Sequence, residues 1–161
     1  ETQITLAQER QQVNAYLSLE MTRFPDKYDV QLHTTVSDDV LLPPFTIQVL
    51  VENALKHAFG NRKTGNHVNV DVYQQDDRLI IMVKDNGQGI SPDLIKLLGQ
   101  QTVPSEHGSG TALHNLNQRL VGLYDKKSGL HFTSSNQGTT VSISIPFTKK
   151  GGQVNESLNC G

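Results

Sequence analysis

The sequence is short of cysteine, tryptophan and long apolar runs. It holds one cysteine, Cys160, and no tryptophan among its 161 residues. A single cysteine excludes an internal disulfide, and its place in a polar tail makes it a poor candidate for a nucleophile. No apolar run approaches the ~20 residues that a membrane-spanning helix needs, and we expect no signal peptide. These absences favour a reducing, cytoplasmic setting.

The chain also lacks a strong charge of either sign. Its formal net charge is -2 at pH 7, its pI is about 6.3, and its basic residues are scattered. A nucleic-acid-binding surface needs a basic patch, so we expect no nucleic-acid partner. The six histidines show no paired ligand spacing, which argues against zinc. A Gly-x-x-x-x-Gly-Lys-Ser/Thr phosphate loop and a Gly-x-Ser-x-Gly elbow are both missing.

What the sequence does contain is a succession of amphipathic helices and alternating strands, enough for one domain. The predicted helices are 5–24, which opens with a Thr5/Gln8 capping box, 47–58, a short one after Pro92, and 111–124. The predicted strands are 29–36, 67–73, 79–83, 130–134 and 139–147, the last four forming two antiparallel hairpins. Together they predict an α+β fold, a two-layer α/β sandwich whose mixed, mostly antiparallel sheet carries helices on one face.

Local composition gives four finer expectations. The continuous apolar run 79–83 predicts a central strand that is covered on both faces. Pro43-Pro44 is expected to place a proline in the first turn of the helix that follows. Residues 99–110, rich in Gly, Ser and Gln, predict a mobile loop, and residues 149–161 predict a disordered tail.

The predicted helix 47–58 has two incompatible faces. One face is an apolar stripe at helical spacing, which would pack on the core. The other presents a carboxylate, a neutral amide and an ammonium together, from Glu52, Asn53 and Lys56. These residues form either a solvated face with an ion pair worth about 0.3–0.5 kcal/mol or a functional site.

Residues 85–89 (Asp-Asn-Gly-Gln-Gly) directly follow the apolar strand and are a second candidate. The ordinary interpretation is an Asp-x-Gly turn. However, a carboxylate at the end of a buried strand is costly unless a hydrogen-bond donor meets it. The exocyclic amine of adenine would do so, whereas the guanine carbonyl would not. Gly87 and Gly89 would let the backbone pass close to a ring or ribose.

Residues 108–111 (Gly-Ser-Gly-Thr) precede the last predicted helix and are a third candidate. They form either a flexible loop with a capping hydroxyl or a set of free N–H groups, at a helix start, that bind phosphate. Thr139, after Gly138 in the last predicted turn, could add a hydroxyl to such a site.

Taken in order, these blocks resemble those of the histidine-kinase, gyrase and MutL ATPase superfamily. Residues 51–58 resemble its N box, 85–90 look like its first glycine box, 108–113 like its second, and 138–140 like its closing strand motif. Segments 4–9, 16–24 and 42–48 look like those of LytS-type sensor histidine kinases, with YpdA-type enzymes the nearest. The resemblance covers about residues 4–147. It implies a Bergerat-type ATP-binding fold, ATP and Mg²⁺ as ligands, and transfer of the γ-phosphoryl group to a histidine.

The resemblance also implies a role for each matching residue. Asn53 would bind Mg²⁺ through its amide oxygen, Lys56 would contact phosphate oxygens, and His57 would line the ribose or phosphate edge. Asp85 would accept a hydrogen bond from the adenine amine, and Glu52 would polarise the attacking group. The other implied nucleotide-binding residues are Gly87, Gly89, Ile90, Gly108, Ser109, Gly110, Thr111, Leu113 and Thr139.

The chain departs from the family pattern in two places. Val49 stands where many kinases have a second asparagine, and no Pro-His-Phe-Leu-Phe-Asn phosphoacceptor segment occurs. We therefore expect a helix from the preceding kinase segment at 1–25, a catalytic domain at 26–148 and a tail at 149–161. The parent would be a plasma-membrane sensor with this part in the cytoplasm, and the partners would be the parent's phosphoacceptor helix and a response regulator. The alternatives are an ATPase and a non-catalytic, nucleotide-gated interaction module.

Overall fold

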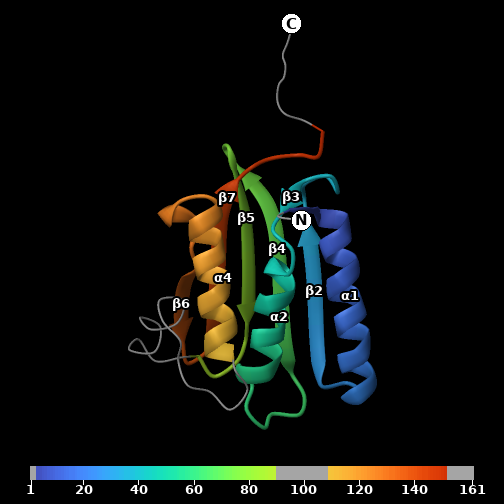
Figure 1. The fold of residues 1–161 in the computed structure, drawn as a ribbon. Helices are drawn as coiled ribbons and strands as arrows, with labels where there is room; N and C mark the ends of the chain where they lie inside the picture. Colours follow the sequence, from blue (N-terminus) through green and yellow to red (C-terminus); the bar gives the residue numbers. More distant parts are fainter. Residues whose placement is uncertain (1–2, 90–108, 152–161) are drawn as a thin grey trace, which may run out of the picture.

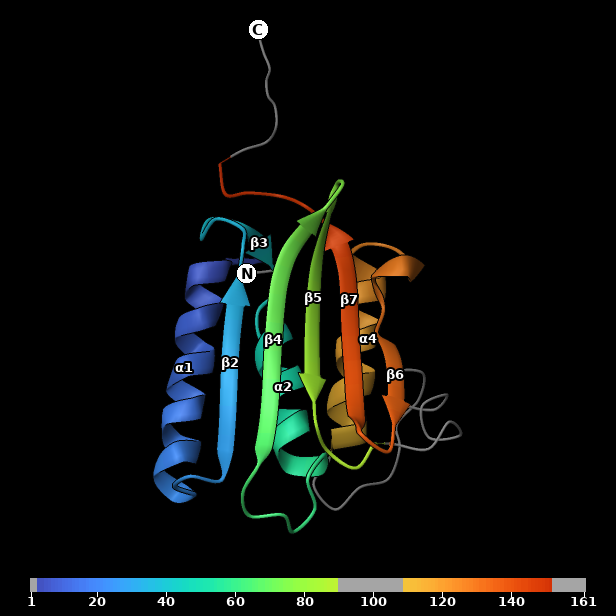
Figure 2. The same ribbon diagram turned by 180° about the vertical axis from the view of Figure 1, so that it is seen from behind.

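In a computed structural model, residues 3–89 and 109–151 of the chain are described. Three helices lie side by side on one face of a five-stranded sheet, with α2 between the other two (Figure 1). They are α1 (Leu6–Arg23), α2 (Thr46–His57) and α4 (Ser109–Leu123). From behind, the described part of the chain places no helix on the other face (Figure 2). The predicted two-layer α+β sandwich is confirmed.

The sheet is mixed and mostly antiparallel, as predicted. Its spatial order is β2-β4-β5-β7-β6. The strands are β2 (Tyr28–Thr34), β4 (Asn66–Gln75), β5 (Arg78–Asp85), β6 (His131–Ser135) and β7 (Gly138–Pro146). Only β2 and β4 run parallel to each other, because α2 lies between them in the chain, and both predicted hairpins are confirmed.

A two-stranded sheet of β1 (Ile4–Thr5) and β3 (Leu41–Leu42) was not predicted. Strands of two residues show no alternation that a sequence could reveal. The chain after β7 adds to this region, since Lys149 forms a β-bridge with Val40 and the Lys150 N–H donates to the Asp39 carbonyl at 2.9 Å. Regular contacts therefore continue into the predicted tail, and residues 152–161 lie outside the described part.

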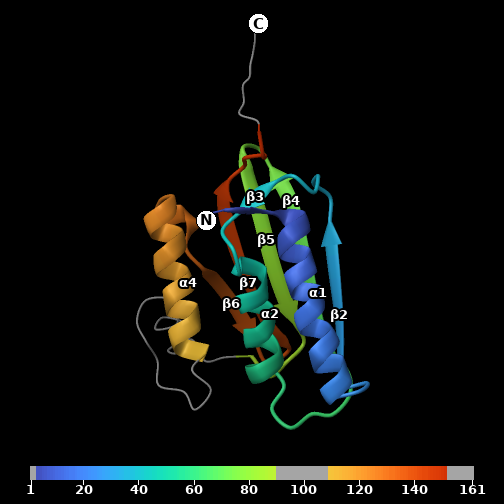
Figure 3. The same cartoon turned by 45° about the vertical axis from the view of Figure 1, so that its right-hand side comes forward.

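The buried apolar side chains form one core between the sheet and the helix layer that lies against it in the oblique view of Figure 3. On β5, Leu79, Ile81 and Val83 face the helices and are at most 2% exposed. Ile80 and Met82 point to the helix-free face and are only half-buried. The prediction that this strand is covered on both faces is therefore wrong, because the continuous apolar run spans one packed face and one open face.

The helix boundaries agree with the sequence except at two starts. The capping box of α1 is present, with Thr5 and Gln8 exchanging hydrogen bonds. However, α2 begins at Thr46, after both prolines, so the prediction of a proline in its first turn is wrong. Helix α4 begins at Ser109, two residues early, so the end of the predicted mobile loop is helical. The rest of that loop and the helix after Pro92 lie outside the described residues.

The start of α2 is capped by a residue from another helix. Phe45 precedes the helix in a left-handed conformation, with φ 64°, and supplies no side-chain cap. Instead, the fully buried carboxylate of Glu9 on α1 accepts hydrogen bonds from the N–H groups of Phe45, Ile47 and Gln48 at 2.9, 2.8 and 3.1 Å. Burial raises the pKa of Glu9, while these three donors and the charge of Arg119 on α4 act to lower it. One carboxylate thus ties α1 to the start of α2.

The lengths and compositions of the three described α-helices leave none suited to crossing a lipid bilayer.

The first helix packs against the rest of the domain, since α1 contacts α2 through Glu9 and the surrounding apolar side chains. The division of the chain at residue 25 stays a prediction.

Candidate functional site

The candidate residues gather at one end of the molecule. The C-terminal end of α2, the end of β5, the β6–β7 turn and the start of α4 all lie at the lower end of Figure 1. The direction of each element explains this, because β5 and α2 run toward that end and α4 starts from it. Three sequence blocks that are far apart in the chain are therefore brought together.

Asp85 is the buried carboxylate of this end, with 8% of its surface exposed. Its Oδ1 accepts hydrogen bonds from the N–H groups of Gly87 at 2.9 Å and Thr139 at 3.2 Å. Burial raises the pKa of Asp85, and these two donors and the charge of Arg62 oppose that rise. None of the described residues donates a hydrogen bond to Oδ2. One carboxylate oxygen is thus satisfied by the protein, and the other is free of the described residues.

The glycines after Asp85 are required by backbone packing. A Cβ on Gly87 would lie 2.2 Å from the carbonyl oxygen of Ala58, which accepts a hydrogen bond from the Gln88 N–H at 2.8 Å. Gly89 has φ +80°, and a Cβ there would lie 1.8 Å from the carbonyl oxygen of Ser135. The turn is therefore pressed against the end of α2 on one side and the end of β6 on the other. The expected approach to a ring or ribose stays a prediction.

The polar residues of α2 lie on its two flanks. Asn53 is half-buried, and its amide forms no hydrogen bond with the described residues. Lys56 Nζ lies 3.8 Å from Glu52 Oε2, with side chains 51% and 31% exposed. The expected surface pair is thus present, and such a pair contributes at most about 1 kcal/mol. Glu52 lies toward α1, because its charge is among those that, after burial, raise the pKa of Tyr16.

The remaining predicted site residues are only partly described. His57 is half-buried in the last turn of α2. Thr139 lies beside Asp85, and its Oγ1 is 2.9 Å from the Ser134 hydroxyl. On α4, Ser109 and Gly110 form the start of the helix, Thr111 is exposed, and Leu113 is buried in the core. Ile90 and Gly108 lie outside the described residues.

Arg62 and Asn86 are two members of this end that the sequence did not single out. The guanidinium of Arg62 donates to the carbonyl oxygen of Asn86 at 2.7 Å and to its Oδ1 at 3.1 Å. Arg62 stands in a polar loop with other cations nearby, so no local pattern distinguishes it. Asn86 lies inside the Asp-Asn-Gly-Gln-Gly block, where only its place between Asp85 and Gly87 hinted at a role.

A hollow also opens near the ends of β5, β6 and β7. Its lining includes Asp85 itself and Ser134, Ser135, Gln137 and Gly138 of the adjoining turn. It also includes Lys84, Thr133 and Thr140, which alternate along their strands with residues that face the helices. These side chains therefore belong to the helix-free face. Asp85 continues the buried positions Leu79, Ile81 and Val83 of β5, so the nucleotide is expected on the helix-bearing side of the sheet.

Residues 44–149 match the sequence model of the Histidine kinase-, DNA gyrase B-, and HSP90-like ATPase family. The chain belongs to this family. It is also 52% identical over 157 residues to the sensor protein LytS of Streptococcus mutans. That alignment covers 98% of this chain and 27% of the relative, so the chain spans about a quarter of the length of the curated proteins it matches. The predicted ATPase family and the resemblance to LytS-type sensor kinases are confirmed, and the closer likeness to YpdA-type enzymes stays a prediction.

Solved structures of histidine kinases share the fold. The mycobacterial sensor histidine kinase MprB aligns with a TM-score of 0.68 and 19% identity, covering 91% of this chain and 97% of that one. The histidine kinase ThkA in complex with the response regulator protein TrrA aligns with a TM-score of 0.61 and 16% identity, covering 94% of this chain and 43% of that one. At these identities the likeness establishes the fold alone, and it agrees with the predicted ATPase-type sandwich.

Proposed function

We propose that this domain binds Mg-ATP beside Asp85 and donates the γ-phosphoryl group to a histidine outside this chain. The observation that carries the proposal is the environment of Asp85. A buried carboxylate with one oxygen saturated by backbone N–H groups and the other free of the described residues is an acceptor kept for a ligand. Membership of the ATPase family makes ATP the ligand to test.

Adenine fits the free oxygen of Asp85 better than guanine does. The exocyclic amine of adenine would donate a hydrogen bond to Oδ2. Guanine carries a carbonyl at the same position, which would meet the carboxylate acceptor to acceptor and leave both groups unsatisfied. The proposed site therefore selects ATP over GTP through a single side chain.

Asn53 would hold the magnesium ion together with the phosphates of ATP. Its amide oxygen is a hard neutral ligand that the described residues leave unbonded, which suits Mg²⁺. The described residues contain no group of three or more His, Cys, Asp or Glu side chains placed to bind a metal, so the nucleotide would supply most ligands. The ion would neutralise charge on the β- and γ-phosphates.

The rest of the chain would bind and orient the nucleotide. Lys56 would leave its weak surface pair with Glu52 to contact phosphate oxygens, and His57 would line the ribose or phosphate edge. The start of α4 at Ser109–Thr111, with Gly108 before it, would present N–H groups to phosphate. These contacts hold the γ-phosphorus in line with the attacking histidine nitrogen.

In the transfer, the lone pair of a histidine ring nitrogen forms a bond to the γ-phosphorus, and the imidazole releases its N–H proton to solvent. The bond from that phosphorus to the β–γ bridging oxygen breaks, and its electron pair leaves with ADP. Glu52 would polarise the attacking imidazole from the α1 side of α2, where its carboxylate lies.

The parent protein would be longer than this chain and anchored in the plasma membrane, with the ATPase domain in the cytoplasm. Its phosphoacceptor histidine would lie on a separate helix, and a response regulator would receive the phosphoryl group next. The high identity to a LytS sensor protein and the likeness to a kinase solved with its response regulator support this assignment.

The substitution Asp85→Asn tests the nucleotide site with little change of shape. Asn Oδ1 can still accept from Gly87 and Thr139, while its Nδ2 replaces the free oxygen and repels the adenine amine. We expect the fold to persist and calorimetric ATP affinity to fall by about a hundredfold, as for a lost charge-assisted hydrogen bond with a mismatched partner. Asp77→Asn, in the exposed β4–β5 turn, is the matched control. Unchanged ATP affinity in Asp85→Asn would show that the pocket assignment is wrong.

The same proteins test phosphoryl transfer. Labelled ATP is incubated with the domain alone and with a separately produced acceptor segment of the parent kinase. We expect label on the acceptor segment only, and none with Asp85→Asn. Strong self-labelling of the domain would contradict the proposal. ATP hydrolysis by the domain alone that Glu52→Ala abolishes would favour the ATPase alternative.

A further inference from the structure

We propose that Arg62 is a positioning residue of the ATP site, which holds the turn after Asp85 in the shape that presents Oδ2 to the nucleotide. The inference rests on the proposed function, and it assigns a role to a residue outside every block that resembles the family motifs. Arg62 would act through Asn86 and not by touching ATP.

The guanidinium of Arg62 is fixed on several sides. Its Nη2 donates to both oxygens of Asn86, and its Nε donates to Asn66 Oδ1 at 2.7 Å. The Cζ atom of the guanidinium lies 5.3 Å from the ring centre of Phe59, a buried residue just after α2. A planar cation held by two hydrogen-bonded partners and a ring has one orientation.

Asn86 and Asn66, which accept from Arg62, also form hydrogen bonds with the neighbouring backbone. Asn86 Oδ1 also accepts from the His67 N–H at 2.8 Å, and its Nδ2 donates to the Gly65 carbonyl at 2.8 Å. Asn66 is 1% exposed, and its Nδ2 donates to the carbonyls of Lys27 and Arg62. The loop after α2, the start of β4 and the turn after β5 are thereby bound together around one guanidinium.

Asp85 directly precedes the turn that the hydrogen bonds of Arg62 and Asn86 hold in place. Asp85 precedes Asn86 in the chain. The hydrogen bond from the Gly87 N–H to Asp85 Oδ1 forms only while the turn keeps its shape. If the turn relaxed, Oδ1 would lose its backbone donor and Oδ2 would change direction. A displacement of about 1 Å in such a contact is enough to weaken binding strongly.

Arg62 also acts on Asp85 through its charge. Burial raises the pKa of Asp85, and the positive charge of Arg62 lowers it toward the usual range. The other charged or titratable groups near this end include Lys27, Asp29, Glu52, Lys56, His57, Lys63, His67 and Lys84. Of the described residues, Arg62 is the one whose charge perturbs the Asp85 pKa. Arg62 therefore favours the ionised carboxylate. In that form Oδ1 accepts from the backbone while Oδ2 can accept from the amine of adenine.

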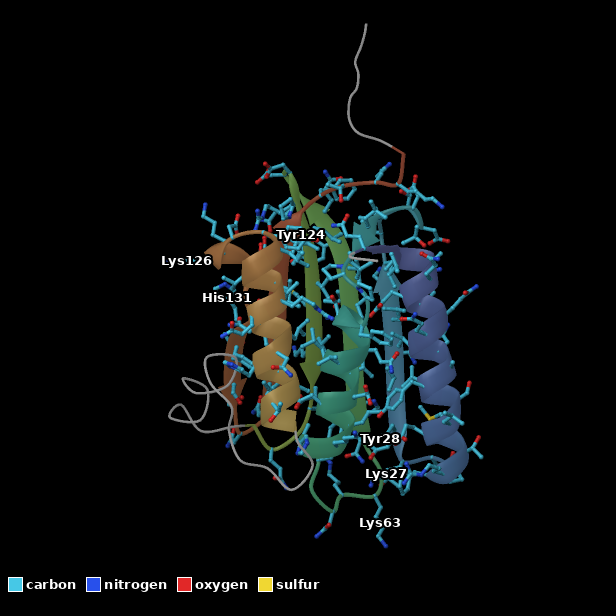
Figure 4. The ribbon with its side chains drawn as sticks, in the orientation of Figure 1. Lys27, Tyr28, Lys63, Tyr124, Lys126 and His131 are labelled. Atoms are coloured by element: carbon cyan, nitrogen blue, oxygen red, sulfur yellow. The ribbon has the colours of Figure 1, made fainter. Side chains whose placement is uncertain are left out.

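The chain offers a matched control one residue away. Lys63 carries the same charge in the same loop, but it forms no hydrogen bond or ion pair with the described residues. Its side chain points away from the domain at the lower end of Figure 4, where Lys27 and Tyr28 are also labelled. Arg62→Met and Lys63→Met each remove one positive charge from this loop, and only the first removes the network.

The experiment is a calorimetric ATP titration of the wild type, Arg62→Met, Arg62→Lys and Lys63→Met from about pH 4.5 to 8. This range lies above the ordinary pKa of an aspartate, because burial raises the pKa of Asp85. ATP needs the ionised carboxylate, so affinity falls as the pH drops through the Asp85 pKa. In Arg62→Met we expect affinity at pH 7.5 to fall roughly tenfold, as when hydrogen bonds of a charged group are lost, and the midpoint of the pH profile to move to higher pH. In Arg62→Lys, which keeps the charge without the planar fork, we expect weaker affinity with the wild-type midpoint.

The outcomes separate this inference from the proposed function. If the wild type binds ATP while Arg62→Met matches Lys63→Met in affinity and midpoint, the positioning role is overturned and the nucleotide site stands. If the wild type binds no ATP at all, the proposed function fails and this inference falls with it. Thermal melts show that each variant is folded at the titration temperature. Should Arg62→Met fail to fold, Arg62→Lys with wild-type affinity would also overturn the role.

Discussion

At the scale of single residues, two glycines in helical or turn positions have opposite requirements. Gly87 has no room for a Cβ, because the carbonyl oxygen of Ala58 would lie 2.2 Å away. Gly122, in α4, has nothing within 4 Å of the position where its Cβ would be built. A glycine in the sequence does not reveal which of these situations it occupies.

We therefore expect Gly87→Ala and Gly122→Ala to change stability in opposite directions. Gly87→Ala should lower the free energy of unfolding by about 1–3 kcal/mol, because the turn must move away from α2. Gly122→Ala should raise it by about 0.5–1 kcal/mol, because alanine loses less backbone entropy in a helix. Urea unfolding of both variants measures the difference. Equal effects would contradict the close contact of Gly87 with α2.

The burial of Asp85 is one residue-scale feature that the sequence could predict, whereas the roles of the site residues stay predictions. Asp85 could be predicted because a carboxylate that ends an apolar strand needs a donor, and the structure does bury it beside Thr139. Arg62 could not be predicted, since its partners Asn66 and Asn86 become neighbours only when the loop after α2 folds against β4 and β5.

At the scale of elements, the cap of α2 shows why a helix start can be missed. The capping box of α1 joins residues three apart, so the sequence predicts it directly. Helix α2 is instead capped by Glu9, whose nearest partner in the chain is 36 residues away. No local pattern marks that contact, and the two prolines suggested a different start.

The substitution Glu9→Gln should test this cap. Glu9 Oε1 accepts from the N–H of Phe45 and Oε2 from those of Ile47 and Gln48, so an amide must turn its own N–H₂ toward a donor. We expect the free energy of unfolding at pH 7 to fall by about 2–3 kcal/mol, because a buried donor loses its acceptor.

Glu20→Gln, on the same helix, is the control. Glu20 is 13% exposed and pairs at 3.3 Å with Arg23, which is 67% exposed. A glutamine can still accept from that guanidinium, so this substitution should cost less than about 1 kcal/mol. Chemical denaturation followed by circular dichroism compares the two variants. A cost for Glu9→Gln no larger than for Glu20→Gln would contradict the capping role.

At the scale of the whole molecule, the two-layer arrangement makes neighbouring residues of β5 unequal. Ile81 faces the helices and is fully buried, whereas Ile80 faces the helix-free side and is half-buried. Ile81→Ala should cost about 2–5 kcal/mol through lost burial and a cavity, and Ile80→Ala clearly less. Equilibrium unfolding measures both, and equal costs would mean that something covers the second face.

The overall fold could be predicted from the sequence to the extent that its contacts are local. The hairpins follow from short turns between alternating strands, and the helices from their apolar stripes. The parallel pairing of β2 with β4, which sets Val30 opposite Val68, spans α2 and has no local signal. The covering of only one face of β5 likewise depends on where all the helices lie.

The carboxylate of Glu9 has a further consequence for motion. The amide hydrogens of Phe45, Ile47 and Gln48 are protected from exchange with solvent by a group that belongs to α1. They can exchange when α1 moves away from α2, even while α2 itself stays helical. The exchange rate of these hydrogens therefore measures how often the first helix separates from the helix that carries Asn53.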